Sequence, residues 1–285
     1  MKIKIISVLS ILIAGCVPLS AQPGYIGIDM GYGTGIPAYS LGTSTKTSLG
    51  GTTYTLEKGN YGQGLSFGFK GGYMFSKNVG MELRMSYLIG SKKEFISSYV
   101  NVDSSLATIT QGDGTITLDK IKMVRMNPAV KLTLGESARP YFLMGLILGF
   151  GTSYSRIEQT TITTTGSIND TTTIETAREY SGGTAFGFNG AFGVDIDLTD
   201  NFVLFGELNF SSISWAAKKS KLTRYMVDGV DQMPLINVSS LETEYVDDYT
   251  VPLTGNSGNS KELKTYLPFG SFGITAGVIY VFGSE

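Results

Sequence analysis

The sequence predicts an all-β protein whose antiparallel, up-and-down strands close into a transmembrane barrel of eight strands. Eight segments of about ten residues alternate apolar with small or polar side chains, as expected for strands with one apolar face. No segment beyond the N-terminus has the roughly 20 consecutive apolar residues that a membrane helix needs. A chain that crosses lipid without such helices must close its sheet, because only then are all its backbone polar groups paired.

The alternation is clearest in the segment Val79–Ile89, where every second side chain is apolar and Gly80, Glu82 and Arg84 lie between them. The expected strands, in chain order, are Tyr25–Gly33, Gly62–Phe75, Val79–Ile89, Lys122–Leu134, Tyr141–Phe150, Thr184–Leu198, Phe202–Phe210 and Tyr266–Phe282. Their apolar face should meet lipid, for example at Leu65, Phe67, Met85, Phe188, Val194 and Ile274. An extra hairpin within residues 211–265 is the alternative that would make ten strands.

The connections between these strands alternate in length, and this alternation predicts the side of the membrane on which each connection lies. Residues 76–78, 135–139 and 199–201 are short turns, and residues 34–61, 90–121, 151–183 and 211–265 are long and polar. Short turns and both termini should therefore lie on one side of the membrane, and all four long connections on the other. We expect 151–183 and 211–265 to be the tallest, with the threonine-rich run near 160–176 extending two strands as a hairpin. A soluble lipocalin-type barrel would need the opposite arrangement of apolar and polar faces.

The N-terminus reads as an export signal over residues 1–21, followed by the barrel domain over residues 22–285. Lys2 and Lys4 precede an apolar stretch that is too short to span a bilayer. Two cleavage sites compete: cleavage after Ala21, which we favour, and a lipobox ending at Cys16, where the cysteine would be lipidated.

The composition excludes several classes of function. The chain has no histidine and a single cysteine, which removes a Cys/His zinc site and the usual general base near neutral pH. Barrel enzymes of the phospholipase, lipid A deacylase and omptin types use histidine, so we expect no enzyme, no bound metal and no cofactor. The net charge of −2 gives no basic excess for nucleic acid.

Eight charged residues fall on the small, polar face of the strands and should point into the lumen. They are Asp29, Lys70, Glu82, Arg84, Arg125, Lys131, Asp195 and Glu207. The structural interpretation is an ion-pair network that fills a narrow barrel, and the functional one is a charged constriction that selects ions. We favour the first, because an eight-stranded barrel barely holds its own side chains.

The long connections hold the candidates for recognition. Trp215, Tyr225, Met226, Tyr245 and Tyr249, in the last of them, are expected to anchor a ligand, or to form an interface girdle or an added hairpin. The glycine-rich stretches Gly31–Gly35 and Gly68–Gly72 open no helix and lack a Walker Lys-Ser/Thr pair, so we interpret them as bends and tight lumen packing.

The export signal ending Leu19-Ser20-Ala21-Gln22, the strand–turn–strand at Gly68–Met85 and the closing strand Gly273–Phe282 together resemble the porin-like outer membrane β-barrel family common in Bacteroidota. The resemblance implies an integral outer-membrane protein that contacts lipid and lipopolysaccharide. The closing strand resembles the signal read by the barrel-assembly machinery, although Gly283-Ser284-Glu285 follow the expected terminal aromatic. Asp170-Thr171-Thr172 resembles the short O-glycosylation sequon of that phylum, which makes Thr171 a candidate acceptor.

The sequence therefore predicts an outer-membrane barrel with a structural, adhesion or surface-interaction role carried by its extracellular loops. A narrow porin-like channel for ions or small solutes is the alternative.

Overall fold

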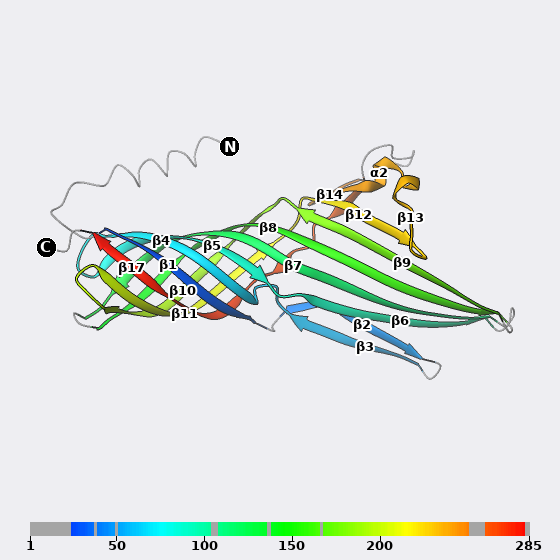
Figure 1. The fold of residues 1–285 in the computed structure, drawn as a ribbon, viewed down its shortest axis with the longest axis horizontal. Helices are drawn as coiled ribbons and strands as arrows, with labels where there is room; N and C mark the ends of the chain where they lie inside the picture. The colour runs from blue at the N-terminus through cyan, green and yellow to red at the C-terminus, as the bar shows by residue number, and fades with distance from the viewer. Residues whose placement is uncertain are drawn as a thin grey trace.

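The computed structural model describes residues 24–36, 39–48, 51–103, 108–135, 138–165, 168–250 and 260–282. Eight antiparallel strands close into a barrel in which β1 pairs with both β4 and β17, as the sequence predicts (Figure 1). The remaining barrel pairs are β4–β5, β5–β7, β7–β8, β8–β10, β10–β11 and β11–β17. The barrel strands are β1 (Gly24–Gly35), β4 (Gly64–Met74), β5 (Val79–Gly90), β7 (Thr108–Thr133), β8 (Ala138–Thr165), β10 (Thr184–Asp197), β11 (Phe202–Trp215) and β17 (Ser271–Phe282).

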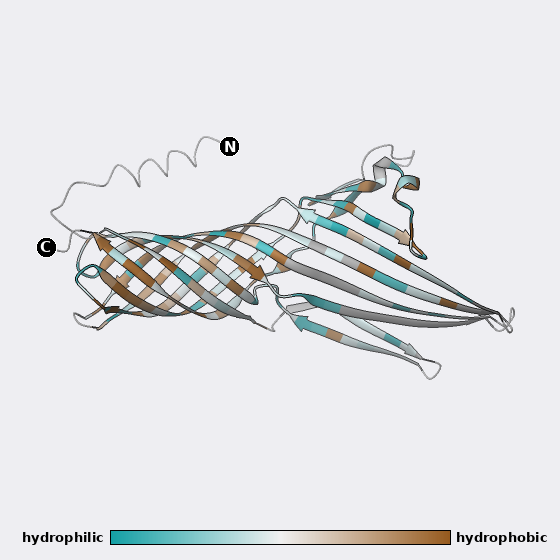
Figure 2. Ribbon diagram, viewed as in Figure 1, coloured by the Kyte–Doolittle hydropathy of each residue, from teal (hydrophilic) through white to brown (hydrophobic). Residues whose placement is uncertain are grey.

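The outer wall of the barrel is apolar, and the predicted phase of each strand is confirmed. Figure 2 shows apolar residues concentrated on the barrel and polar ones along the strands beyond it. Leu65, Phe67, Met85, Phe188 and Ile274 all point outward and are exposed. On β8, where both faces are apolar, the outward side chains are Phe142, Met144, Leu146 and Phe150, also as expected. This wall is what a barrel presents to lipid.

A belt of aromatic side chains from the region of β4, β11 and β17 lies on the outer wall at the end of the barrel that carries the short turns. Tyr73 packs against Phe75 at 5.6 Å between ring centroids, and Tyr280 packs against Phe202 at 5.3 Å and Phe282 at 5.0 Å. Tyrosine favours the membrane–water interface because one end of its ring is apolar and the other polar, and girdles of aromatic residues flank the apolar band of outer-membrane barrels. The belt therefore marks one boundary of the membrane-spanning part.

The short turns at 76–78 and 199–201 are built alike. The Ser76 hydroxyl accepts hydrogen bonds from the backbone N–H groups of Asn78 and Val79, and the Thr199 hydroxyl accepts one from Phe202. Both termini of the described chain lie at this end of the barrel (Figure 1). The predicted signal, 1–21, and Cys16 within it lie outside the described residues.

The long connections are largely strands, and this departs from the expectation of polar loops. They form one curved extracellular sheet that continues β7 and β8 beyond the barrel, in the order β3-β2-β6-β7-β8-β9-β12-β14-β15. The added elements are β2 (Tyr39–Ser48), β3 (Gly51–Gly59), β6 (Lys93–Asp103), β9 (Ile168–Ser181), β12 (Lys219–Val227), β13 (Val230–Asp231), η1 (Met233–Leu235), α2 (Val238–Leu241), β14 (Glu242–Val246), β15 (Ser260–Leu263) and β16 (Leu267–Pro268). None of the added strands widens the barrel, so the ten-stranded alternative is wrong.

The threonine-rich hairpin is confirmed. Strand β8 runs on to Thr165, and β9 returns from Ile168 with Thr165 paired to Ile168 at the tip. Strand β9 is separated from β10 by Gly182 and Gly183, which have φ of 74° and 82°, a region that L side chains rarely adopt. The glycine pair therefore turns the chain from the extracellular sheet back into the barrel wall.

The predicted heights of the long connections above the membrane are right for 151–183 and wrong for 211–265. The tips of β6, β7, β8 and β9 are level, because Asp103 pairs with Thr108 and Thr108 pairs with Thr165. The segment 90–121 thus reaches as far as 151–183, whereas the strands of 211–265 end short of this level (Figure 1). The strands of 211–265 are added at the edge of the sheet, where β12 pairs with β9 only as far as Val227 and Ile174, so this segment ends below the tip of β9.

Within the described residues, no helix is long and apolar enough to cross a membrane.

Candidate functional site in the lumen and above it

All eight predicted lumen charges point inward. Six are buried, and Arg84 and Arg125 are half-buried by exposed area. They come from β1, β4, β5, β7, β10 and β11, so they reach the lumen from most of the wall. The structure brings seven of them into ion pairs, and Arg125 makes none with a described residue.

Arg84 is the centre of the larger group. Its guanidinium lies 2.6 Å from Glu207, 3.3 Å from Glu82 and 3.4 Å from Asp29. Lys70, which is 0% exposed, lies 3.3 Å from Glu207 and 3.5 Å from Glu82. Two cations thus face three carboxylates in the interior, and Glu82 and Glu207 each pair with both cations, whereas Asp29 pairs with Arg84 alone.

Aromatic side chains complete this group. The ammonium of Lys70 lies over the Phe205 ring, 3.2 Å from its centroid. Lys131 pairs with Asp195 at 2.6 Å and lies 4.0 Å from the centroid of the Tyr141 ring. Such cation–π contacts stabilise an ammonium that has lost water.

Two tyrosines, which were not predicted from the sequence, donate hydrogen bonds to the buried carboxylates across an intervening strand. Tyr25 on β1 donates to Glu82 on β5 at 3.0 Å, and Tyr141 on β8 donates to Glu207 on β11 at 2.7 Å. In each case the intervening strand carries a glycine opposite the tyrosine, Gly72 or Gly193. Both tyrosines occupy inward positions of the alternation, so the strand phase is the signal that could have found them.

A layer of amides lies on the extracellular side of the charges. Arg125 faces a cavity of about 40 Å³ that Asn127, Asn189 and Asn209 also line. Asn209 donates to the Thr275 hydroxyl at 2.8 Å. A space of this size holds only a few water molecules.

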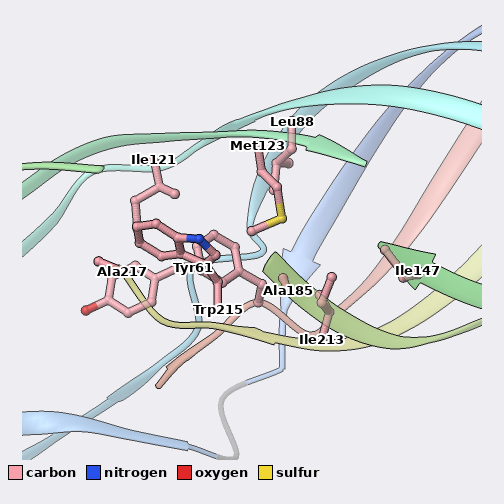
Figure 3. Close-up of a cluster of buried hydrophobic side chains, with 10 residues drawn as sticks. Tyr61, Leu88, Ile121, Met123, Ile147, Ala185, Ile213, Trp215 and Ala217 are labelled. Atoms are coloured by element: carbon pink, nitrogen blue, oxygen red, sulfur yellow. The ribbon is translucent and has the colours of Figure 1, made fainter. Parts of the chain in front are cut away.

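An apolar plug fills the barrel above the amide layer (Figure 3). Trp215, Tyr61 and Phe269 form its centre, with ring centroids 5.9 Å apart for Tyr61 and Phe269 and 6.4 Å apart for Trp215 and Phe269. The Trp215 indole N–H donates to the backbone carbonyl of Gly182 at 3.1 Å. The other buried members are Leu88, Ile121, Met123, Ile147, Ala185, Ile213 and Ala217.

Trp215 is therefore not an exposed anchor for a ligand or partner, because it is fully buried in the plug. Tyr245 packs against the plug from the extracellular side, and Tyr225 and Met226 are half-buried on β12. Tyr249 is exposed in the part of the chain after β14. The aromatic residues of this segment thus divide between the lumen and the extracellular sheet.

The remaining candidates lie on the extracellular strands. Thr171 is exposed on β9, opposite Ile162 of β8, and its glycosylation stays a prediction. Asp247, which follows β14, forms an ion pair with Lys264 at 2.7 Å. Among the described residues, no group of three or more histidine, cysteine, aspartate or glutamate side chains could hold a metal.

Comparison with known proteins identifies the fold family. The model of the outer membrane protein β-barrel domain matches residues 7–226. The structure is similar to that of Ail, the attachment invasion locus protein of Yersinia pestis, with 11% identity and a TM-score of 0.33 over 93% of this chain and 100% of that one. It is also similar to Neisserial surface protein A, with 11% identity and a TM-score of 0.31 over 90% and 96% of the two chains. No curated protein matches the chain by sequence.

The Bacteroidota type of the predicted family stays a prediction. The family match covers seven of the eight barrel strands, from β1 to β11, together with the lumen charges that they carry. With the closed antiparallel barrel and its apolar wall, it places the protein in the outer membrane, and the chain belongs to the outer membrane protein β-barrel domain family.

Proposed function

We propose that this outer-membrane barrel acts in surface recognition or adhesion through its extracellular sheet, with the barrel itself serving as a closed anchor. The observation that carries the proposal is the filled lumen, in which the charge network around Arg84 is followed by the amide layer and then by the plug around Trp215. A channel needs a continuous path for hydrated ions. Successive layers of packed side chains across the lumen argue against the channel alternative.

The extracellular sheet supplies a surface for recognition. One edge of this sheet is β3, on which Tyr54 and Leu56 are 71% and 53% exposed. Exposed apolar side chains on an edge strand are a common means of pairing with another chain, because backbone and side chains both contribute. The sheet is ordered by backbone pairing, so a partner would meet a preformed surface.

The proposal also has consequences for partners. The apolar wall would contact lipid and lipopolysaccharide, and the closing strand β17 would be recognised by the barrel-assembly machinery. It assigns no catalysis to the chain, an expectation that rests on the lack of histidine in the sequence.

The test compares three proteins displayed in the outer membrane of a non-adherent bacterial host. They are the natural chain, the variant Tyr54→Ser/Leu56→Ser, which removes the exposed apolar side chains of β3, and the lumen variant Lys131→Met/Asp195→Leu. We expect the natural chain and the lumen variant to attach to monolayers of cultured epithelial cells or to aggregate the host cells, and the β3 variant to lose this property. Attachment that is kept by the β3 variant but lost by the lumen variant would contradict the proposed roles.

A further inference from the structure

A cavity of about 270 Å³ lies on the extracellular side of the plug, between the barrel mouth and the extracellular sheet. Its floor is apolar and consists of Trp215, Ala217 and Leu267. Trp215 and Leu267 are paired across β11 and β16, so backbone pairing holds the floor in place. Cavities for drug-sized molecules run from about 300 to 1,000 Å³, so this one fits a small molecule or a single side chain.

Two tyrosine rings form one wall of the cavity. Tyr180 on β9 and Tyr245 on β14 stack with their centroids 5.9 Å apart and an interplanar angle of 30°. The Tyr245 hydroxyl is held at 3.1 Å from the Ser220 hydroxyl. Burial raises the pKa of Tyr245 to about 12, so its phenol is neutral at physiological pH. Aromatic faces of this kind attract cations and apolar groups.

A buried hydroxyl also lines the cavity and has no hydrogen-bond partner in the described part of the chain. Ser153 on β8 is 3% exposed, and its Oγ makes no hydrogen bond with a described residue. Buried polar atoms in folded proteins are nearly always paired, so an unpaired one that lines a cavity marks a position for a ligand group. The Ser153 hydroxyl can both donate and accept a hydrogen bond.

Among the described residues that line the cavity, the one charged side chain is negative. Glu262 on β15 is exposed and lies next to Tyr245 in the pairing of β14 with β15. No described lining residue is basic, and nearby Lys264 is bound to Asp247 at 2.7 Å. An anionic ligand would therefore meet an unbalanced carboxylate, whereas a cation would be attracted by Glu262 and by both rings.

We propose that this cavity binds an organic cation, an alkylammonium or guanidinium group on an apolar stem. The stem would lie on Leu267 and Ala217, the cation would lie between the tyrosine rings and Glu262, and a polar group beside it would bond to Ser153. The cation could belong to a free amine or to a lysine or arginine side chain of a partner protein, since both share this chemistry. The inference does not rest on the adhesion proposal, because the cavity has the same lining whether or not the extracellular sheet attaches to a cell.

The test uses the fluorescence of Trp215, the single tryptophan of the chain, which lies in the cavity floor. The full mature chain in nanodiscs of zwitterionic lipid is titrated with n-butylammonium, and separately with a glycine–serine peptide that carries one arginine. We expect a saturable fluorescence change with at least one of the two. Response to butylammonium alone identifies a free amine as the source, and response to the peptide alone identifies a partner's side chain. n-Butanol and butyrate, which have similar stems, should bind at least tenfold more weakly.

Matched variants separate the cavity from the surrounding surface. Glu262→Gln should weaken binding about three- to tenfold, and Tyr180→Leu should weaken it by a similar factor, because each removes one attraction for the cation. Glu244→Gln, an exposed carboxylate on the same strand as Tyr245 but outside the lining, should leave binding unchanged. The proposal is overturned if neither cation binds saturably, if butanol binds as well as butylammonium, or if Glu262→Gln binds like the natural chain.

Discussion

Tyr141 donates a 2.7 Å hydrogen bond to Glu207, although the two residues lie on strands that are not neighbours. Strand β10 runs between them, and Gly193 is opposite Tyr141 on one side and Glu207 on the other. A Cβ added at this position would lie 2.6 Å from the Tyr141 hydroxyl and 2.9 Å from the Glu207 side chain. The bond across the strand therefore depends on the glycine, and Gly72 plays the same part between Tyr25 and Glu82.

The first prediction follows from this contact. Gly193→Ala should destabilise the barrel by about 1–3 kcal/mol, because the added methyl displaces Tyr141 in a packed interior. Gly206→Ala is the matched control on the next strand, where an added Cβ would meet nothing within 4 Å, and it should change stability little. Urea unfolding in lipid vesicles measures both. If both substitutions lower the free energy of unfolding equally, the hydrogen bond between Tyr141 and Glu207 does not depend on Gly193.

The second prediction concerns the ion pair of Lys131 with Asp195. Lys131→Met should cost about 3–5 kcal/mol, because it leaves a buried carboxylate without its partner. The double variant Lys131→Met/Asp195→Leu should recover most of this loss, because no buried charge is left unpaired. Lys92→Met breaks the exposed pair with Glu94 at 2.6 Å and should cost at most about 1 kcal/mol. In a double-mutant cycle, the free energies of unfolding lost in Lys131→Met and in Asp195→Leu are compared with the loss in the double variant. If the two single losses add up to the loss in the double variant, Lys131 and Asp195 do not interact.

The third prediction tests the lipid-facing wall. Val194 lies on the outward face of β10 between exposed Phe192 and Ile196. If it is near the midplane, Val194→Arg should cost about 2–4 kcal/mol, because an arginine would be placed in hydrocarbon. Val230→Arg, on an exposed extracellular position, is the control and should be close to neutral. Both variants are compared with the natural chain by their free energy of unfolding in lipid vesicles. If Val194→Arg leaves this free energy unchanged, this face of the strand meets water.

The fourth prediction concerns assembly of the extracellular hairpin. Gln159 of β8 pairs with Ile174 of β9, so removal of 159–174 with a short turn in its place leaves the lower rungs intact. The buried Ala177 and the cavity residue Tyr180 lie below the cut. We expect the shortened chain to fold and insert like the natural one, as judged by the heat-dependent shift in gel mobility of folded barrels. Failure to insert would show that the hairpin is needed for folding.

The barrel could be predicted because lipid imposes a period of two on every strand that crosses it. The inward direction of Lys70, Glu82 and Arg84 follows from the same alternation. Which charges meet could not be predicted, because the contacts depend on strand register and on glycines such as Gly72 that let a side chain cross a strand.

The parts outside the membrane were harder to predict for a physical reason. On β3, for example, side chains of both faces are exposed, so no continuous apolar face is required and the segment looks like a loop. One local signal was present and missed: Asp228-Gly229 between Val227 and Val230 forms the turn of the β12–β13 hairpin, with φ of 51° and 77°. Trp215 was misjudged because a tryptophan in a long connection resembles a surface anchor, whereas its strand phase directs it into the lumen.

The closed lumen is the central claim, and single-channel recording in planar bilayers tests it most directly. The natural chain, refolded and inserted with a general porin as the positive control, should give no steady current steps above bare lipid, because the Arg84 network and the Trp215 plug fill the barrel. A stable ohmic conductance of the natural chain that changes when Arg84 is replaced by methionine would contradict the closed anchor and establish the channel.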